Sequence, residues 1–262
     1  MINWTLIGIL FAVALVCCAM GFKRFVWFMS IGYGYAVAGI AVAALVYGAA
    51  TQAMTVPLAV ALLVCAAYGV RLGTFLLKRE TGNKAYKKVL DAKVGKEPPI
   101  FVKVIMWLAM GVIYIAETAG LHFRLSNGTG DDWVLWLGIV IMAAGAVIEG
   151  LADKQKSSQK AKRPDMVANE GLFKFMRCPN YFGEILFWTG VFVSGVTAYQ
   201  GAAQWIIAVL GYVCIVAIMV DGAKRMEKGH MSRYGQNPEY QAYAGKTPIL
   251  FPFIPLYHLN KQ

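Results

Sequence analysis

The feature that most limits how this chain can fold is a series of long apolar runs separated by short polar segments. Several runs contain about 17 to 25 nearly uncharged residues, the length that an α-helix needs to cross a bilayer. Because unpaired backbone groups are costly in lipid, such runs cross a membrane as helices. The sequence therefore predicts an all-α, polytopic integral membrane protein, with residues 1–262 forming a single seven-helix membrane domain. The seven spans are expected at residues 3–20, 27–48, 55–77, 101–122, 133–151, 182–199 and 204–221.

The composition agrees with this class and limits the partners. Of the 262 residues, 58% are hydrophobic and only 15% are charged. The net charge of +11 resides in loops and in the C-terminal tail, so it favours membrane lipids or an anionic cofactor over nucleic acid. The cysteines form no disulfide framework, because Cys17, Cys18, Cys65 and Cys214 lie inside apolar runs.

The distribution of Lys and Arg among the loops predicts the orientation. Loops 78–100 and 152–181 contain seven cations each, whereas loop 49–54 contains none and the fourth loop contains only Arg124. Since short cytoplasmic loops carry the excess of Lys and Arg, we expect the N-terminus outside and the C-terminus in the cytosol. The seven cations of the third loop are Lys78, Arg79, Lys84, Lys87, Lys88, Lys93 and Lys96.

The most informative motif, Arg-Cys-Pro-Asn-Tyr-Phe-Gly-Glu at 177–184, begins the sixth span. Pro179 suits the first turn of a helix, and an acid there meets the favourable end of the helix dipole. A helix start does not require Asn180, Tyr181 and Gly183 at this spacing. Because polar groups at the mouth of a membrane span are costly and usually functional, we interpret this motif as part of a binding site.

Other ionisable residues are expected on the same cytosolic side. Glu149 and Asp153 share one helix face, where they could accept hydrogen bonds from a nucleotide cofactor or simply pair with lysines. The basic loop that contains Lys160 could hold phosphates, and Arg225 and His230 extend the seventh helix into the cytosol. A site facing the cytosol suits a water-borne cofactor and a lipid-borne substrate, which favours an enzyme over a transporter.

The third span contains Tyr68 and Arg71, which are one helical turn apart. A guanidinium inside a span costs several kcal/mol unless it pairs or reaches the headgroups. Arg71 either reaches the headgroups, or it is a charge that holds an anion or polarises Tyr68, which then acts as a proton donor. The sequence has no Cys/His metal spacing, no P-loop and no dinucleotide fingerprint, so no metal is expected and a nucleotide would not bind on a Rossmann unit.

Taken together, these segments resemble the steroid 5α-reductase family, especially its bacterial branch of largely uncharacterised membrane proteins. The resemblance is most specific at 177–184, where the family usually has His in place of Cys178 and Glu or Asp at the last position. It covers about residues 60–255. Further similar positions are Glu149, Ala152, Asp153 and Gln155 at a helix end, and Met226, Glu227, Lys228, Tyr240, Tyr243 and Pro252 in the tail.

The resemblance implies a membrane reductase that transfers hydride from NADPH to an activated C=C bond of a steroid-like or other lipophilic substrate. It implies a cofactor-binding half, mainly residues 149–255, that opens to the cytosol from a bacterial inner membrane. The implied cofactor-binding residues are Glu149, Asp153, Lys160, Arg177, Asn180, Tyr181, Glu184, Arg225 and His230. The implied catalytic residues are Tyr68, Arg71 and Glu184.

Two points leave the substrate and the reaction open. Steroid-reducing members carry a Gln-Glu pair in the second span that grips the substrate ketone, whereas this span offers only Tyr33 and Tyr35. A methyltransferase that uses S-adenosylmethionine is the alternative, because isoprenylcysteine carboxyl methyltransferases also have an Arg-His-Pro-x-Tyr-x-Gly element and a Tyr-x-x-Tyr tail. Asn180 and the acid that follows Gly183 favour the reductase.

Overall fold

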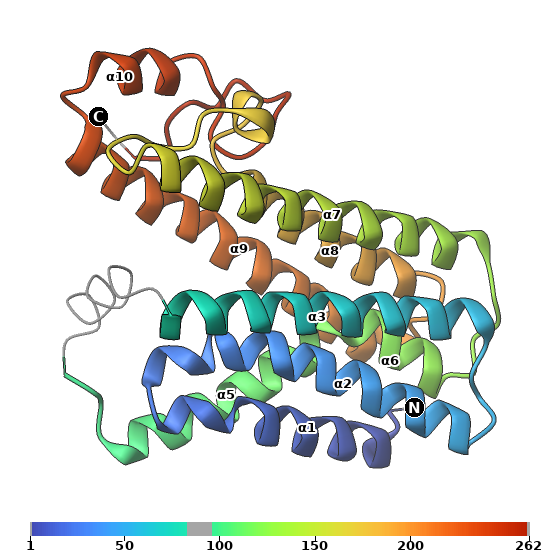
Figure 1. The fold of residues 1–262 in the computed structure, drawn as a ribbon. Coiled ribbons are helices and arrows are strands. Elements are labelled where there is room, and N and C mark those ends of the chain that lie inside the picture. The colour runs from blue at the N-terminus through green and yellow to red at the C-terminus, as the bar shows by residue number, and fades with distance from the viewer. Residues whose placement is uncertain (1, 83–95, 261–262) are drawn as a thin grey trace. The chain divides into compact units, whose positions relative to one another are not determined.

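A computed structural model describes residues 2–82 and 96–260 of the chain (Figure 1). Within these residues the secondary structure is helical throughout, which confirms the predicted all-α class. The α-helices are α1 (Trp4–Cys18), α2 (Ile31–Ala50), α3 (Val56–Gly82), α5 (Ile100–Glu117), α6 (Ala119–Ser126), α7 (Trp133–Lys162), α8 (Pro179–Gly195), α9 (Gly201–Tyr234) and α10 (Pro238–Ala244). Short 3-10 helices cover Ala19–Phe22, Phe25–Phe28 and Gly171–Lys174. Four predicted third-loop cations lie outside the described residues, namely Lys84, Lys87, Lys88 and Lys93.

Among residues 2–82 and 96–260, six helical segments are long and apolar enough to cross a membrane, by length and composition. They indicate an integral membrane protein. The remaining predicted span, 182–199, corresponds to α8, which has 17 residues and begins at Pro179. The six segments are Trp4–Phe22, Phe25–Ala50, Val56–Gly82, Ile100–Glu117, Trp133–Lys162 and Gly201–Tyr234.

Three predicted spans differ most from the helices that form. The predicted fourth span is divided between α5 and α6 at Thr118, whose Oγ1 donates to the carbonyl oxygens of Tyr114 (2.8 Å) and Ile115 (3.2 Å). Such side-chain bonds compete with the helical ladder and bend helices. In contrast, α7 and α9 continue to Lys162 and Tyr234, because the polar residues after each apolar run include many good helix formers.

The residues gather into two compact units. Unit 1 comprises Met1–Ile139 and Gly190–Tyr212, and unit 2 comprises Val140–Thr189 and Val213–Gln262. Each unit therefore combines segments that are distant in the sequence, and α7, α8 and α9 contribute to both. The ionisable residues predicted for the cofactor belong to unit 2, whereas Tyr68 and Arg71 belong to unit 1.

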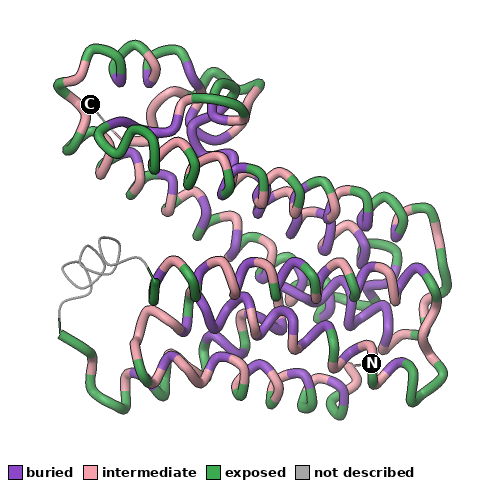
Figure 2. Tube along the Cα trace, viewed as in Figure 1, coloured by how far each residue is buried: buried purple, intermediate pink, exposed green. Residues whose placement is uncertain are grey.

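In unit 1, α1 packs against α2 and α5, and α2 packs against α3. The buried residues of α1 are Leu6, Leu10, Ala14 and Cys18, which recur every four residues and so lie on one side of the helix. Buried and more exposed positions alternate along this helix in Figure 2. The other sides of α1 are equally apolar, as expected of a helix that faces lipid. Between α2 and α3 the backbones touch, because a Cβ atom at Gly69 would lie only 2.5 Å from the carbonyl oxygen of Gly34.

A buried arginine stabilises the part of unit 1 that precedes α7. Arg124 donates from Nε to the carbonyl oxygen of Ser194 (2.8 Å) and from Nη1 to that of Gly130 (2.7 Å). Its Nη2 pairs with Asp132 at 3.0 Å and bonds to Thr197 at 2.5 Å. Arg124 thus lies in α6 as a paired, buried group and not as an exposed loop cation, which makes this loop even less positive than predicted.

Candidate active site

The motif at 177–184 is positioned by a close contact between α7 and α8 in unit 2. A Cβ atom at Gly183 would lie 2.6 Å from the backbone nitrogen of Glu149 and 2.8 Å from the carbonyl oxygen of Gly145. A Cβ atom at Gly145 would in turn lie 2.4 Å from the backbone nitrogen of Phe187. Only residues without a side chain allow helices to approach this closely. Glu184 directly follows Gly183, so the contact holds Glu184 near the helix turn that carries Glu149.

Three acidic side chains are buried along these two helices. The exposed fraction is 2% for Glu149 and 8% for both Asp153 and Glu184. The predicted shared face of Glu149 and Asp153 is confirmed, since both lie within the continuous helix α7. Because buried carboxylates are costly unless they interact with donors or cations, their burial is consistent with a polar site and not with a solvated helix end.

Arg177, which precedes α8, is buried and ion-paired with Glu227 of α9 at 3.1 Å. The same carboxylate accepts hydrogen bonds from the ring nitrogen Nδ1 of His258 (3.0 Å) and from the backbone nitrogens of Leu259 (2.9 Å) and Asn260 (3.1 Å). The Arg177 guanidinium also donates to the carbonyl oxygen of Tyr257. This ion pair therefore attaches the C-terminal segment to the start of α8.

The guanidinium of Arg177 is only partly satisfied by these contacts. Its Nε and Nη1 atoms are buried and make no hydrogen bond to any other described residue. Leaving a buried donor without an acceptor costs about 1–3 kcal/mol, and more for a charged group. A phosphate or carboxamide oxygen would satisfy these donors. The residues of unit 2 thus fit a nucleotide cofactor, since they supply buried acceptors from three carboxylates and buried donors from Arg177.

Lys160 has a structural role in unit 2 that sequence reasoning did not predict. Its Nζ atom donates to the carbonyl oxygens of Pro164 (2.6 Å) and Met166 (2.7 Å) and to the hydroxyl of Tyr234 (3.1 Å). An ammonium group has three donors, so these contacts use all of them. Lys160 would have to release one of them to bind a cofactor phosphate.

The other predicted cofactor residues lie at different depths in unit 2. Asn180 and Tyr181 are half-buried in the first turn of α8, and the Tyr181 ring packs 3.4 Å from the position of a Cβ atom at Gly222. Arg225 is exposed and ion-paired with Asp221, one turn earlier on α9. The half-buried ring of His230 packs with Tyr234 and Tyr240, at centroid distances of 5.8 and 6.3 Å.

In unit 1 the two predicted catalytic residues contact each other. The guanidinium carbon of Arg71 lies 5.6 Å from the centre of the Tyr68 ring, and Tyr68 is 2% exposed. The predicted neighbourhood of Tyr68 and Arg71 is therefore confirmed, although their roles remain predictions. Gly69, between them in the sequence, forms the backbone contact with α2 and fixes this turn of α3.

Comparison with known proteins identifies the group to which this chain is related. Residues 11–247 match the family described as "Protein of unknown function (DUF1295)". The chain belongs to the DUF1295 family. It is also 27% identical over 146 residues to "Steroid 5-alpha-reductase DET2" of Solanum lycopersicum. The match covers 54% of this chain and 51% of the relative, so the chain spans about half the length of this curated relative. No solved structure matches the chain.

The DUF1295 match and this distant relative support the predicted resemblance to steroid 5α-reductases as a family relationship. At the position where those enzymes usually have His, this DUF1295 chain has Cys178, which is buried with its Sγ atom 3.8 Å from the sulfur of Met226. Burial raises the pKa of the Cys178 thiol to about 12, so the group is a neutral packing element.

The sequence predicted no role for Glu227, which was noted only as a position in the tail. A signal for it was present, because Met219, Ala223 and Glu227 recur every four residues along α9 and all three are buried. An acid on the buried side of an apolar helix requires a partner. The partner, Arg177, lies 50 residues away in the sequence, so the helical period alone could not identify it.

Proposed function

We propose that this protein is a membrane reductase that transfers a hydride from NADPH to an activated C=C bond of a lipophilic substrate. The observation that carries the proposal is the combination in unit 2 of buried acids with Arg177, which keeps two buried donors without an acceptor. A nucleotide cofactor presents ribose hydroxyls, a carboxamide and phosphates, and so it needs both kinds of group. The name of the Solanum lycopersicum relative, a steroid 5-alpha-reductase, supplies the reaction class.

The ionisable and amide residues of the candidate site have proposed tasks. Glu149 and Asp153 accept hydrogen bonds from ribose hydroxyls, while Asn180 and Glu184 hold the carboxamide of the nicotinamide. Arg177 donates from Nε and Nη1 to a phosphate oxygen. When bound, NADPH would supply the hydride. Lys160, Tyr181, Arg225 and His230 complete the proposed cofactor-binding set.

The proposed chemistry on the substrate requires a hydrogen-bond donor in a water-poor place. A hydride that adds to the β-carbon of an enone moves an electron pair towards the carbonyl oxygen, and a proton then binds to the α-carbon. A buried hydroxyl that donates to this oxygen stabilises the developing charge. We assign this role to Tyr68, with Arg71 over its ring as a cation that favours charge at the hydroxyl. The substrate is thus a steroid-like or other lipophilic enone.

We further propose that α8 serves as the sixth of seven spans in a single membrane domain. The N-terminus would then lie outside and the C-terminus in the cytosol, so that the cofactor site opens to the cytosol of a bacterium. A reporter that is active only in the cytosol, fused to the C-terminus, should be active. An inactive reporter in a stable fusion would reverse the orientation.

Cofactor binding can be tested by thermal denaturation of the detergent-purified protein with NADPH, NADH and S-adenosylmethionine in parallel. A ligand at 100 times its Kd stabilises the folded state by about 2.7 kcal/mol. We expect NADPH to raise the melting temperature, whereas Glu184→Gln and Asn180→Ala should lose this shift. Glu239→Gln is a matched control, because Glu239 is an exposed acid that pairs with Arg163 at 2.9 Å.

The outcomes separate the candidate functions. If S-adenosylmethionine alone stabilises the protein, the proposed function is methyl transfer and not hydride transfer. If Glu184→Gln and Asn180→Ala both retain NADPH affinity, the assignment of the site is wrong even if the protein is a reductase.

A further inference from the structure

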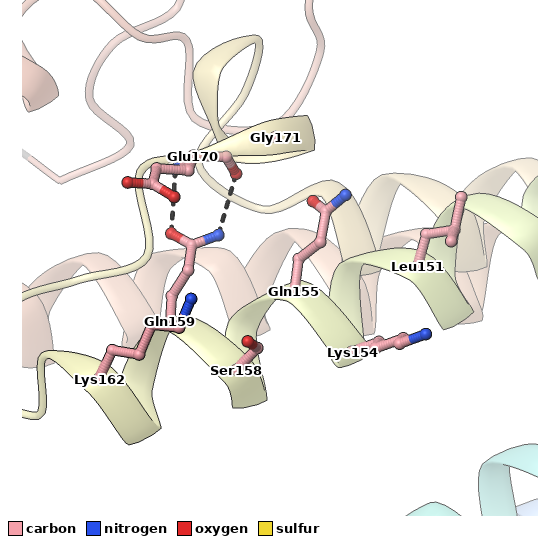
Figure 3. A pocket seen from close by; sticks show the side chains of 8 residues that line it. All are labelled: Leu151, Lys154, Gln155, Ser158, Gln159, Lys162, Glu170 and Gly171. Carbon is pink, nitrogen blue, oxygen red and sulfur yellow. Dashed lines mark hydrogen bonds between the residues drawn. The ribbon is translucent and has the colours of Figure 1, made fainter.

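A groove of about 420 Å³ lies on the exposed side of α7 (Figure 3), and none of the three buried acids lines it. One side of the groove is α7 itself, with Lys154, Ser158 and Lys162 one turn or two turns apart. The other side is the chain at Glu170 and Gly171. Neither Lys154 nor Lys162 belongs to the proposed cofactor-binding set, so the groove is independent of the proposed reaction.

The wall of the groove is held in place by two glutamine side chains. Gln159 accepts from the backbone nitrogens of Asn169 (2.9 Å) and Glu170 (3.0 Å), and its amide donates to the carbonyl oxygen of Glu170 (3.1 Å). Gln155 accepts from the backbone nitrogen of Leu172 at 2.9 Å. Gly171 has a φ of +65°, and a Cβ atom there would lie 2.5 Å from the Gln155 side-chain oxygen, so glycine allows this close approach. The groove is therefore a fixed feature of unit 2.

The groove continues an exposed stripe on the membrane-spanning part of α7. Val140, Val147 and Leu151 are exposed, and they lie on the same side of the helix as Lys154, Ser158 and Lys162. Successive steps of seven, four, three, four and four residues keep this stripe on one side of a helix of 3.6 residues per turn. The stripe thus changes from aliphatic to cationic between Leu151 and Lys154.

The change from aliphatic to cationic side chains along α7 occurs over about the distance that separates the acyl chains of a bilayer from its headgroups. With a rise of 1.5 Å per residue, Lys154 lies about 4.5 Å beyond Leu151 along the helix and Lys162 about 16 Å beyond it. The headgroup layer extends about 5–8 Å on each side of the hydrocarbon core. Lys154 therefore falls within this layer, whereas Lys162 must bend towards it.

We propose that this groove binds the phosphate of an anionic phospholipid, with an acyl chain of the lipid along Val140, Val147 and Leu151. Lys154 and the hydroxyl of Ser158 contact the phosphate, and Lys162 adds a weaker attraction. Glu170 is the acidic residue on the opposite wall, so the lining has a net charge of +1. A soluble phosphate would use only the polar half of the stripe, while a phospholipid uses both halves.

The test is a titration of delipidated protein in detergent with phosphatidylglycerol, phosphatidylcholine and glycerol phosphate, with bound lipid counted by native mass spectrometry. One Lys near a membrane surface contributes about 1 kcal/mol, so Lys154→Ala should weaken phosphatidylglycerol binding about fivefold. Lys162→Ala should weaken it less, and Lys154→Arg should retain it. Lys228→Ala, which removes an exposed cation of α9, should leave binding unchanged.

Several results would overturn the proposal. Equal binding of phosphatidylcholine would show that charge plays no part. Equal binding of glycerol phosphate would identify a site for soluble anions, because the acyl chain would then contribute nothing. If Lys154→Ala and Lys228→Ala bind phosphatidylglycerol alike, the lipid does not occupy this groove. An unchanged melting temperature without lipid will verify that Lys154→Ala is folded, as expected for an exposed position.

Discussion

Replacement of Gly183 by alanine tests whether the contact between α7 and α8 organises the candidate site. The added methyl group would lie 2.6 Å from the backbone nitrogen of Glu149, 2.8 Å from the carbonyl oxygen of Gly145 and 2.9 Å from the Glu149 Cβ atom. Two of these neighbours are backbone atoms of another helix, so they cannot move unless the helices separate. Overpacking of this kind typically costs about 1–3 kcal/mol.

Replacement of Gly229 in α9 by alanine is a control that separates the overpacking cost at Gly183 from the change in helix propensity. Alanine is favoured over glycine in a helix interior by about 1 kcal/mol, and this gain applies to both positions. At Gly229 the nearest atom to the added methyl group would be the end of the flexible Arg233 side chain, at 3.4 Å. We therefore expect Gly183→Ala to be about 1–3 kcal/mol less stable than Gly229→Ala. For a chain of this size, 1 kcal/mol corresponds to roughly 2–4 °C in melting temperature.

The assay is thermal denaturation in detergent, with and without NADPH. Gly145→Ala disturbs the same contact from the other helix, so the double variant Gly145→Ala/Gly183→Ala should lose less stability than the sum of the single variants. The NADPH shift should also decrease in Gly183→Ala, because Glu184 moves relative to Glu149. The reasoning is refuted if Gly183→Ala is as stable as Gly229→Ala.

Three further predictions concern ionisable groups, of which Glu227 and Tyr68 are buried and Asp132 is half-buried. Glu227→Ala should lower the free energy of unfolding by about 3–5 kcal/mol, because it leaves the buried Arg177 without its acidic partner. Limited proteolysis should then cleave the C-terminal segment faster, and a variant as resistant to the protease as the wild type would contradict this. Burial raises the pKa of Asp132, but hydrogen bonds, first that from Thr197, outweigh burial and hold this pKa below 3.8. The ionised Asp132 therefore stabilises the fold above pH 3.8, and this stabilisation is lost as the pH falls below that value. Asp132→Asn should melt at a lower temperature than the wild type at neutral pH, and the difference should shrink on acidification; a difference that stays constant with pH would exclude this linkage. Tyr68→Phe should keep the NADPH shift and reduce turnover of an enone lipid, whereas unchanged turnover would remove Tyr68 from the mechanism.

Part of the candidate site could be predicted from the sequence because it depends on local geometry. Pro179 marked the start of α8, and the spacing of Glu149 and Asp153 placed both on one face of α7. The contact between Tyr68 and Arg71 followed from their separation of three residues in a helix. These relations depend on the helical period, which is the same in every protein.

The sequence could not show which long-range partners each charged group would have. Arg177 was expected at a cofactor, yet it also binds Glu227 and the carbonyl oxygen of Tyr257. Lys160 was expected at a phosphate, and its donors are used within unit 2. Charge and spacing along the chain are compatible with many such pairings, and only the positions of distant segments select one.

By itself, the sequence determined that this is an all-α membrane protein with polar groups at the ends of its apolar runs. That result depends on the transfer of each segment from water to lipid and on its own backbone hydrogen bonds, so every run can be judged separately. The tertiary structure alone decided that Gly183 meets Gly145, that Arg177 meets Glu227, and that Lys154 and Lys162 line a groove. Those relations depend on how closely separate segments pack, and no local period in the sequence specifies such distances.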